Sequence, residues 1–257
     1  MTSTKFILAI FESMHKRFLN FSEIFGFKQH DNLLTVLDGV KNVAVIGRGS
    51  SINESNPWSL IEKTDFKIIM NRVDLESLPQ MRGYKIDAQI AQPPPPYSVL
   101  PPSLIEKYAV DYVSSNKTQK NKQFYKFKRC YQKCAAEILR FPDDSELGYP
   151  FTRSTTYAPT QCGSILRVLF NVCSVERIVF AGVDFFMDGY WNKSEINEEC
   201  APRIVPSVNF EKKGKPLAKW INDSVKVVSL DRDIELYFPE KTRILFGDSC
   251  CESIKFY

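Results

Sequence analysis

Histidine is nearly absent from this chain of 257 residues, which contains only His15 and His30. Its seven cysteines form no CxxC repeat and no cluster with histidine. Zinc sites are built from closely spaced Cys and His ligands, so a zinc site is not expected. An odd number of irregularly spaced cysteines instead favours reduced thiols in a cytoplasmic protein.

Long apolar runs are also missing. Segment 5–20 is rich in apolar residues, but Glu12, His15, Lys16 and Arg17 interrupt it, so it is too polar to cross a membrane. No small-residue cleavage site follows, which argues against a signal peptide. The near-helical spacing of its apolar residues predicts a helix packed on the domain. Peripheral contact with a membrane, or with a second copy of the chain, is the alternative.

The chain carries a small excess of positive charge. The net charge is +4 and charged residues make up 25% of the chain, with no stripe of Lys and Arg. This pattern is compatible with a small anionic ligand but is not typical of nucleic-acid binding, so no nucleic-acid partner is expected. Apolar residues make up 44% of the chain, enough for a sizeable core.

Strand-like and helix-like patterns alternate along the chain. The predicted strands are 42–47, 66–70, 86–91, 109–113, 177–182 and 225–230, and the predicted helices are 5–20, 30–39, 102–107, 119–139, 161–173 and 214–223. This alternation predicts an α/β fold with a mostly parallel, Rossmann-like sheet flanked by helices. We expect an N-terminal helical segment over 1–40, one domain over 41–257, and a small lid inserted at about 190–216, where the chain is polar and broken by proline.

A glycine-rich turn follows the first predicted strand, in the sequence VAVIGRGSS. A dinucleotide fingerprint needs a third glycine where this chain has Ile52, and no GKS or GKT of a P-loop follows. Gly47, Gly49 and Ser51 therefore indicate either an ordinary tight turn or an anion site of another kind.

Four further segments lie at predicted strand ends or at a predicted helix start. Asn71 ends one strand and Gln92 precedes a run of prolines, while Gln161-Cys162-Gly163 begins a helix and Gly182-Val183-Asp184 ends another strand. Amide side chains can read a base or a ribose, and helix starts attract anions. Each segment alone is equally compatible with a simple turn.

Taken in order, these segments resemble the small bacterial sialyltransferases of glycosyltransferase family 42, which are more distantly similar to the animal sialyltransferases of family 29. The stretch FPDDSELGYPF is similar to a Phe-Pro-Asp…Leu-Gly-Tyr segment of that family, and Gly182–Phe186 matches its Gly-Ile-Asp-Phe-Tyr strand end. The resemblance covers roughly residues 42–230.

The resemblance implies inverting transfer of sialic acid, or a related acid sugar, from a CMP donor to a hydroxyl of a glycan or lipid-linked glycan, with no metal or other cofactor. A homo-oligomer is compatible with it. The nucleotide-binding residues that the resemblance implies are Gly47, Arg48, Gly49, Ser51, Asn71, Gln92, Cys162 and Gly163.

The chain departs from the family at its catalytic positions. Phe186 replaces the first catalytic tyrosine, and Tyr190 is the nearest replacement. No histidine lies near 208–209, where the family has its general base. Because a carboxylate can do this work, Asp184, Asp188 and Glu211 are the candidates. The alternative roles are fixing of the following turn for Asp184 and plain solvent exposure for Asp188 and Glu211. These losses leave open a nucleotide-binding module without turnover.

A competing motif, Asp231-x-Asp233, follows the predicted strand 225–230. Such a pair of carboxylates can hold a divalent cation against a donor diphosphate, which would make the chain a metal-dependent nucleotide-diphosphate-sugar transferase. Capping of a helix or turn by Asp231 is the favoured interpretation.

Overall fold

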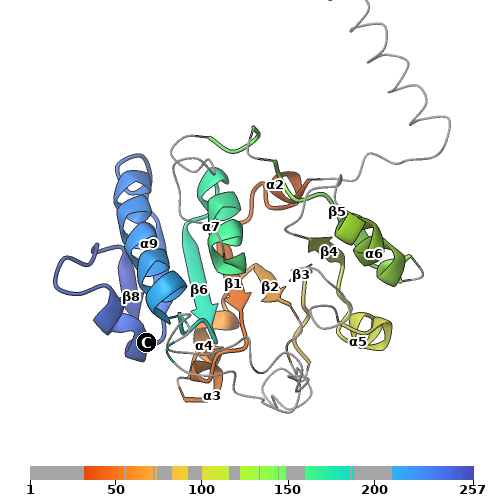
Figure 1. The fold of residues 1–257 in the computed structure, drawn as a ribbon, viewed down its shortest axis with the longest axis horizontal. Helices are drawn as coiled ribbons and strands as arrows, with labels where there is room; N and C mark the ends of the chain where they lie inside the picture. The colour runs from red at the N-terminus through yellow and green to blue at the C-terminus, as the bar shows by residue number, and fades with distance from the viewer. Residues whose placement is uncertain are drawn as a thin grey trace, which may run out of the picture. The chain divides into compact units, whose positions relative to one another are not determined.

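The computed structural model describes residues 32–54, 56–71, 73, 83–91, 100–115, 122–132, 134–143, 145–148, 160–185, 187 and 210–257. Residues 32–257 belong to one compact unit (Figure 1). The predicted helix 5–20 lies outside the described residues. Asn32 forms an isolated parallel β-bridge with Arg140, and the helix α2 (Leu33–Val36) lies within the predicted helix 30–39.

Among the described residues, a single sheet of eight strands forms the middle of this unit, and each of these strands pairs in parallel with its neighbours. The strands are β1 (Asn42–Ile46), β2 (Phe66–Met70), β3 (Ala88–Ala91), β4 (Tyr112–Ser115), β5 (Glu137–Leu139), β6 (Arg177–Ala181), β7 (Glu235–Phe238) and β8 (Ile254–Phe256). Their spatial order is β5-β4-β3-β2-β1-β6-β7-β8. The predicted Rossmann-like α/β fold is confirmed, with a sheet that is parallel throughout.

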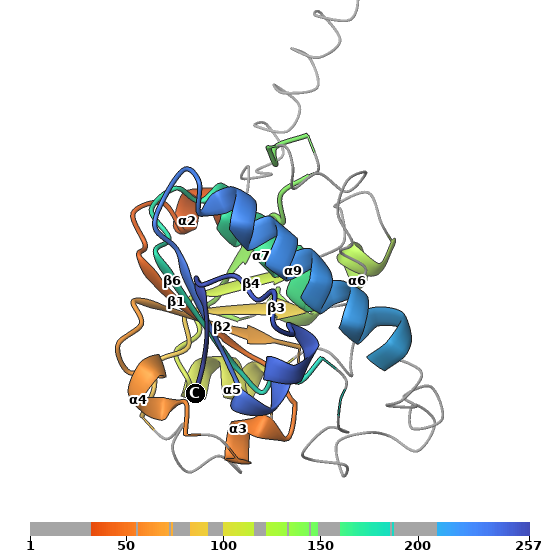
Figure 2. The same ribbon diagram turned by 90° about the vertical axis from the view of Figure 1, so that its left-hand side faces the viewer.

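Helices cover both faces of the sheet (Figure 2). One face packs against α2, α7 (Gln161–Asn171) and α9 (Lys215–Val228), and the other against α4 (Trp58–Ile61), α5 (Pro102–Lys107) and α6 (Lys122–Tyr131). Three short helices complete the described part: α3 (Ser51–Glu54), the π-helix η4 (Phe210–Gly214) and the 3₁₀ helix η5 (Glu240–Leu245).

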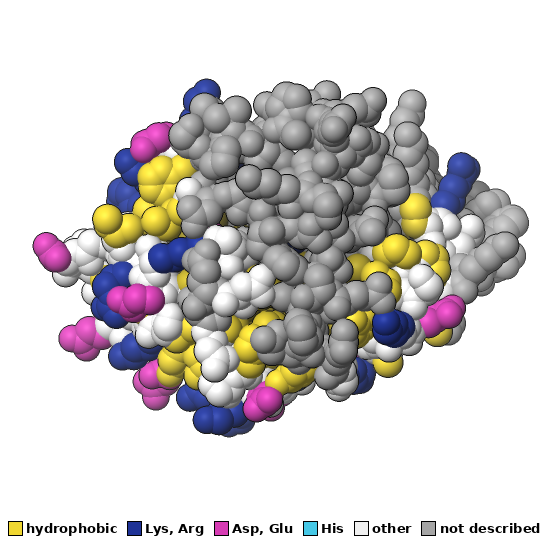
Figure 3. Space-filling view, turned by 90° about the horizontal axis from the view of Figure 1, so that it is seen from below, with side chains coloured by type: hydrophobic (Ala, Val, Ile, Leu, Met, Phe, Trp, Pro, Cys, Tyr) yellow, Lys and Arg dark blue, Asp and Glu magenta, His cyan; other side chains and the backbone are white. Residues whose placement is uncertain are grey.

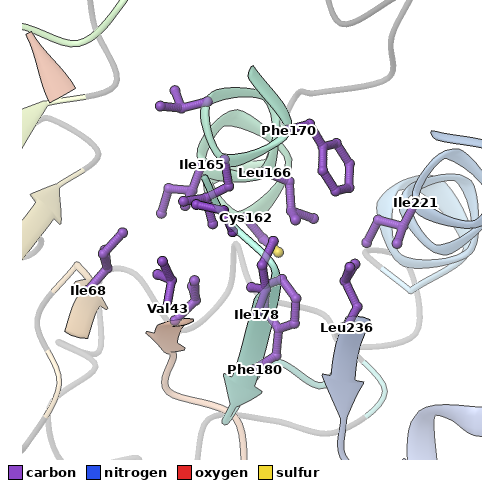
Figure 4. Close-up of a cluster of buried hydrophobic side chains, with 14 of the residues drawn as sticks. Val43, Ile68, Cys162, Ile165, Leu166, Phe170, Ile178, Phe180, Ile221 and Leu236 are labelled. Atoms are coloured by element: carbon purple, nitrogen blue, oxygen red, sulfur yellow. The ribbon is translucent and has the colours of Figure 1, made fainter. Parts of the chain in front are cut away.

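The central strands are apolar on both sides because each side meets a helical layer. In β1, Val43 and Val45 point into the core beneath α7, whereas Ala44 and Ile46 point into the opposite core. This alternation follows from the two-residue period of a strand. Figure 4 shows the first core, in which Ile165 and other α7 side chains meet the sheet. A strand buried on both faces reads as a continuous apolar run, as β1 does.

The predicted strand 225–230 is wrong, because residues 225–228 belong to α9. Leu217, Ile221, Val225 and Val228 are spaced by four, four and three residues and form the buried stripe of that helix. The predicted helix 119–139 is too long, since α6 ends at Tyr131 and residues 137–139 form strand β5. Strands β7 and β8 were not predicted, and β4 begins three residues later than the predicted strand 109–113.

The turn after α9 fastens that helix to α7. Arg232 donates from its guanidinium to the carbonyl oxygens of Val172, Leu169 and Phe170, which are at the C-terminal end of α7. A cation at this end adds a donor to the last carbonyls of the helix and complements the helix dipole. Burial lowers the pKa of Arg232 from its usual value.

Candidate functional site

The strand order reverses between β1 and β6. Strands β2 to β5 extend from β1 in one direction, and β7 and β8 extend from β6 in the other. Open parallel sheets bind ligands beyond the carboxyl ends of the strands at such a reversal. The glycine turn, residues 47–51, leaves the sheet at this point from β1, and residues 182–185 leave it from β6.

The glycine turn lies directly against the end of β6. Gly47 N–H donates to Ala181 O and Gly49 N–H donates to Gly182 O, both at 2.7 Å. Gly182 has φ +62°, and a Cβ on it would lie 2.7 Å from Gly47 O. A Cβ on Gly49 would overlap the carboxylate of Asp184. The glycines thus permit close approach of two protein segments. From the sequence alone, this role could not be distinguished from close approach to a phosphate.

Asp184 is the buried centre of this contact, with a side chain only 2% exposed. One carboxylate oxygen accepts from Ser51 N–H at 3.0 Å and from Ser50 Oγ at 3.3 Å, and the other accepts from Ser51 Oγ. Nearby, Tyr257 donates its hydroxyl to Phe180 O, and burial together with the charge of Asp184 raises the pKa of Tyr257. The side-chain contacts of Asp184 thus fix the glycine turn, whereas the predicted alternative role concerned the turn that follows Asp184.

Lys241 completes the cluster and was missed by sequence reasoning. Its Nζ lies 3.2 Å from Asp184 Oδ2 and donates to Ser50 Oγ at 2.7 Å. Lys241 comes from η5 and is 191 residues from Ser50 in the chain. The surrounding sequence, PEKTR, carries no motif that would have pointed to it. We call Ser50, Ser51, Asp184 and Lys241 the switch-point cluster.

The turn that carries Asp184 is fixed by aromatic packing. Phe185 has φ +53°, a left-handed conformation that is unfavourable for a residue with a side chain. Its ring lies 5.4 Å from that of Phe238 and 5.7 Å from that of Phe246, centroid to centroid. Gly214 of η4 packs against the Phe185 carbonyl so closely that a Cβ there would overlap it. These contacts hold the strained residue and therefore the orientation of Asp184.

A second set of contacts joins the ends of β2 and β3 to the start of α7. Asn71 also has a left-handed φ, +59°. The Ile90 carbonyl accepts from Asn71 N–H at 2.9 Å and from Gln161 Nε2, while Gln89 Nε2 donates to Asn71 O at 2.9 Å. The fold thus brings Asn71 and the α7 start, both predicted to bind the nucleotide, to one carbonyl group.

The start of α7 is capped by Thr160, whose Oγ1 accepts from Gly163 N–H at 3.1 Å. Gln161 Oε1 is buried and has no hydrogen-bond partner in the described part of the chain. Cys162 points into the apolar core (Figure 4), and burial raises its pKa to about 12. Its thiol is therefore a packing group, and contact with a nucleotide from this position would come from the backbone.

Glu211 lies in η4, beside the Asp184 turn through the contact of Gly214 with Phe185. Its exposed carboxylate pairs with Lys215 at 2.8 Å. It lines an open groove of about 550 Å³ together with Lys215, Pro216, Lys219, Ile244 and Leu245. Residues 210–214 of the predicted lid are thus helical, and 215–216 begin α9.

Some of the remaining predicted site residues lie among the described residues, and others lie outside them. Gln92, Asp188, Tyr190 and residues 190–209 of the predicted lid lie outside the described residues, and Arg48 is partly buried. Asp231 and Asp233 are exposed in the turn after α9, so they do not follow a strand as predicted. Within the described ranges, no three His, Cys, Asp or Glu side chains are grouped as a metal site.

Seen from below in Figure 3, the Lys and Arg side chains of the described residues are interspersed with Asp and Glu. None of the described helices combines the length and the apolar character needed to span a membrane. No known protein family matches the chain, and no curated protein is significantly similar to it in sequence.

Proposed function

We propose that this protein is a glycosyltransferase of sialyltransferase type, which moves sialic acid or a related acid sugar from a CMP donor to a glycan hydroxyl. The observation that carries the proposal is that three predicted nucleotide-binding elements, the glycine turn, Asn71 and the start of α7, lie at the carboxyl edge of the sheet. The glycine turn joins the end of β6, and Asn71 joins the start of α7. A helix start at the carboxyl edge of a parallel sheet suits a nucleotide monophosphate.

The proposed reaction is a single inverting displacement. The acceptor hydroxyl oxygen attacks the anomeric carbon and forms the new C–O bond, while the C–O bond to the phosphate breaks and CMP leaves with the electron pair. The hydroxyl proton passes to a general base. Backbone amides, Arg48 and Tyr190 would meet the charge that develops on the departing phosphate.

In this proposal Glu211 is the general base and Asp184 a positioning residue. The carboxylate of Asp184 is buried and already accepts three hydrogen bonds. The carboxylate of Glu211 is exposed in a groove, on a helix that touches the residue after Asp184. An acceptor hydroxyl can therefore reach Glu211 without displacing the switch-point cluster.

Calorimetric titration with CMP and with UDP, each with and without EDTA, tests the donor class. We expect CMP to bind with the same affinity in both conditions. Binding of UDP alone, and only with a divalent metal, would refute the proposal.

Turnover of CMP-sialic acid by Glu211→Gln then tests the base. The expected result is a kcat lowered by about 100-fold or more with an unchanged Kd for CMP, the usual contribution of a general base. Glu176→Gln, which alters an exposed carboxylate paired with Lys41 at 2.8 Å, is the matched control and should retain full activity.

The burial of Asp184 favours a second candidate, a nucleotide-binding module without turnover. Of the two candidate bases among the described residues, Asp184 and Glu211, burial places Asp184 out of reach of an acceptor hydroxyl. This candidate predicts CMP binding by the wild-type protein without hydrolysis or transfer of CMP-sialic acid.

A further inference from the structure

The switch-point cluster contains a cation that the proposed function has not yet used. Lys241 and Asp184 form an ion pair whose two partners differ in exposure, 22% for the lysine side chain and 2% for the aspartate. The lysine side chain therefore reaches solvent, whereas the carboxylate is enclosed by the protein. A ligand that approaches the cluster from solvent can therefore contact the lysine side chain but not the carboxylate.

The position of this pair matters for any anion at the glycine turn. An ionised Asp184 beside the turn would repel a phosphate if its charge were not compensated. Lys241 supplies that compensation at 3.2 Å and also donates to Ser50 of the turn at 2.7 Å. Ser50 in turn donates to Asp184. One ammonium thus cancels the unfavourable charge and orders a residue of the turn.

The backbone that carries Lys241 is held in place. Thr242, the next residue, is fully buried, and its Oγ1 donates to Pro239 O at 2.7 Å. Glu240 N–H donates to Tyr257 O at 2.8 Å, which ties η5 to the end of strand β8. A lysine on a fixed backbone loses less conformational freedom when it binds a ligand.

We propose that Lys241 is a phosphate-binding residue, whose ammonium contacts the phosphate of the donor nucleotide at the glycine turn. This inference rests on the proposed function, because it takes the turn as the site of the donor phosphate. It assigns a direct contact to a residue outside the segments that carry the family resemblance. Lysine is suited to this role as a compact charge with three donors.

The test compares CMP with cytidine, which lacks the phosphate, by calorimetry on the full chain. In Lys241→Met we expect CMP to bind about 10- to 100-fold more weakly, as for the loss of a hydrogen bond to a charged group, with cytidine affinity unchanged. Lys241→Arg should restore most of the CMP affinity. Arg243→Met is the matched control, since it removes the same charge from η5 at a residue that pairs with Glu240 at 2.7 Å, and it should bind CMP like the wild type.

Lys241→Met leaves a buried carboxylate unpaired and can unfold the protein, so a second variant is needed. Asp184→Asn combined with Lys241→Met removes both charges and leaves no buried ion. We expect this double variant to fold and to remain deficient in CMP binding. Wild-type CMP affinity in the double variant would overturn the proposal, because Lys241 would then serve only to neutralise Asp184.

The other outcomes separate this inference from the proposed function. If wild-type protein binds neither CMP nor cytidine, the proposed function fails and the inference fails with it. If CMP binds, and Lys241→Met weakens CMP and cytidine equally or not at all, only the inference fails.

Discussion

The buried ion pair makes Asp184→Ala a sharp test of how the site is held together. Removing one partner of a buried pair costs about 3–5 kcal/mol. Lys241 is 22% exposed, so water partly replaces the lost carboxylate and the lower part of that range applies. The Ser51 amide, which donates to Asp184 at 3.0 Å, loses its acceptor and adds about 1 kcal/mol. We therefore expect a free energy of unfolding lower by about 4 kcal/mol.

Urea denaturation followed by circular dichroism measures this change directly, and thermal unfolding should show a melting temperature lower by about 8–16 °C. Asp223→Ala is the control. Its ion pair with Lys219 has a similar length, 2.9 Å, but the side chains are 57% and 78% exposed. An exposed pair contributes at most about 1 kcal/mol. Equal losses of stability in the two variants would refute the view that Asp184 joins the glycine turn to β6.

Three further predictions concern neighbouring features. Gly182→Ala places a Cβ on a residue with φ +62°, 2.7 Å from the Gly47 carbonyl oxygen. The free energy of unfolding, measured in urea, should fall by at least about 1–2 kcal/mol, and an unchanged value would contradict the close approach. Arg232→Met should cost about 1–3 kcal/mol because the Phe170, Leu169 and Val172 carbonyls lose a charged donor. Thermal unfolding measures this loss, and an unchanged melting temperature would contradict it. Burial raises the pKa of Cys162 to about 12, so its protonated thiol should resist iodoacetamide at pH 8 while exposed Cys173 reacts. Peptide mass mapping measures the labelling, and equal labelling of the two cysteines would rule out the buried position of Cys162.

The sheet could be predicted from the sequence where the local pattern was strong. Residues 42–46, 66–70 and 177–181 are short apolar runs between turn signals, and each is a strand within one residue of the predicted bounds. The run VKVV at 225–228 carries the same local signal but belongs to α9. A short apolar run does not distinguish strand from helix, and only the buried stripe shared with Leu217 and Ile221 decides it.

The candidate site could be predicted only in part. The glycine turn, Asn71 and the start of α7 were recognised as segments, and their placement at one edge follows from the direction shared by parallel strands. Lys241 could not be found in this way, because its sequence neighbourhood resembles any exposed helical turn. Its partners are 57 and 191 residues away.

The sequence by itself determined the α/β class and the strands that carry the candidate site, because two-residue and 3.6-residue periodicities are local properties of the chain. Only the tertiary structure decided what the side chains at the site do. It turned Cys162 into the core, closed Gly49 onto Asp184, and set Lys241 against both Asp184 and Ser50. Charge pairing and close backbone approach depend on distances between remote segments, and those distances exist only once the sheet has assembled.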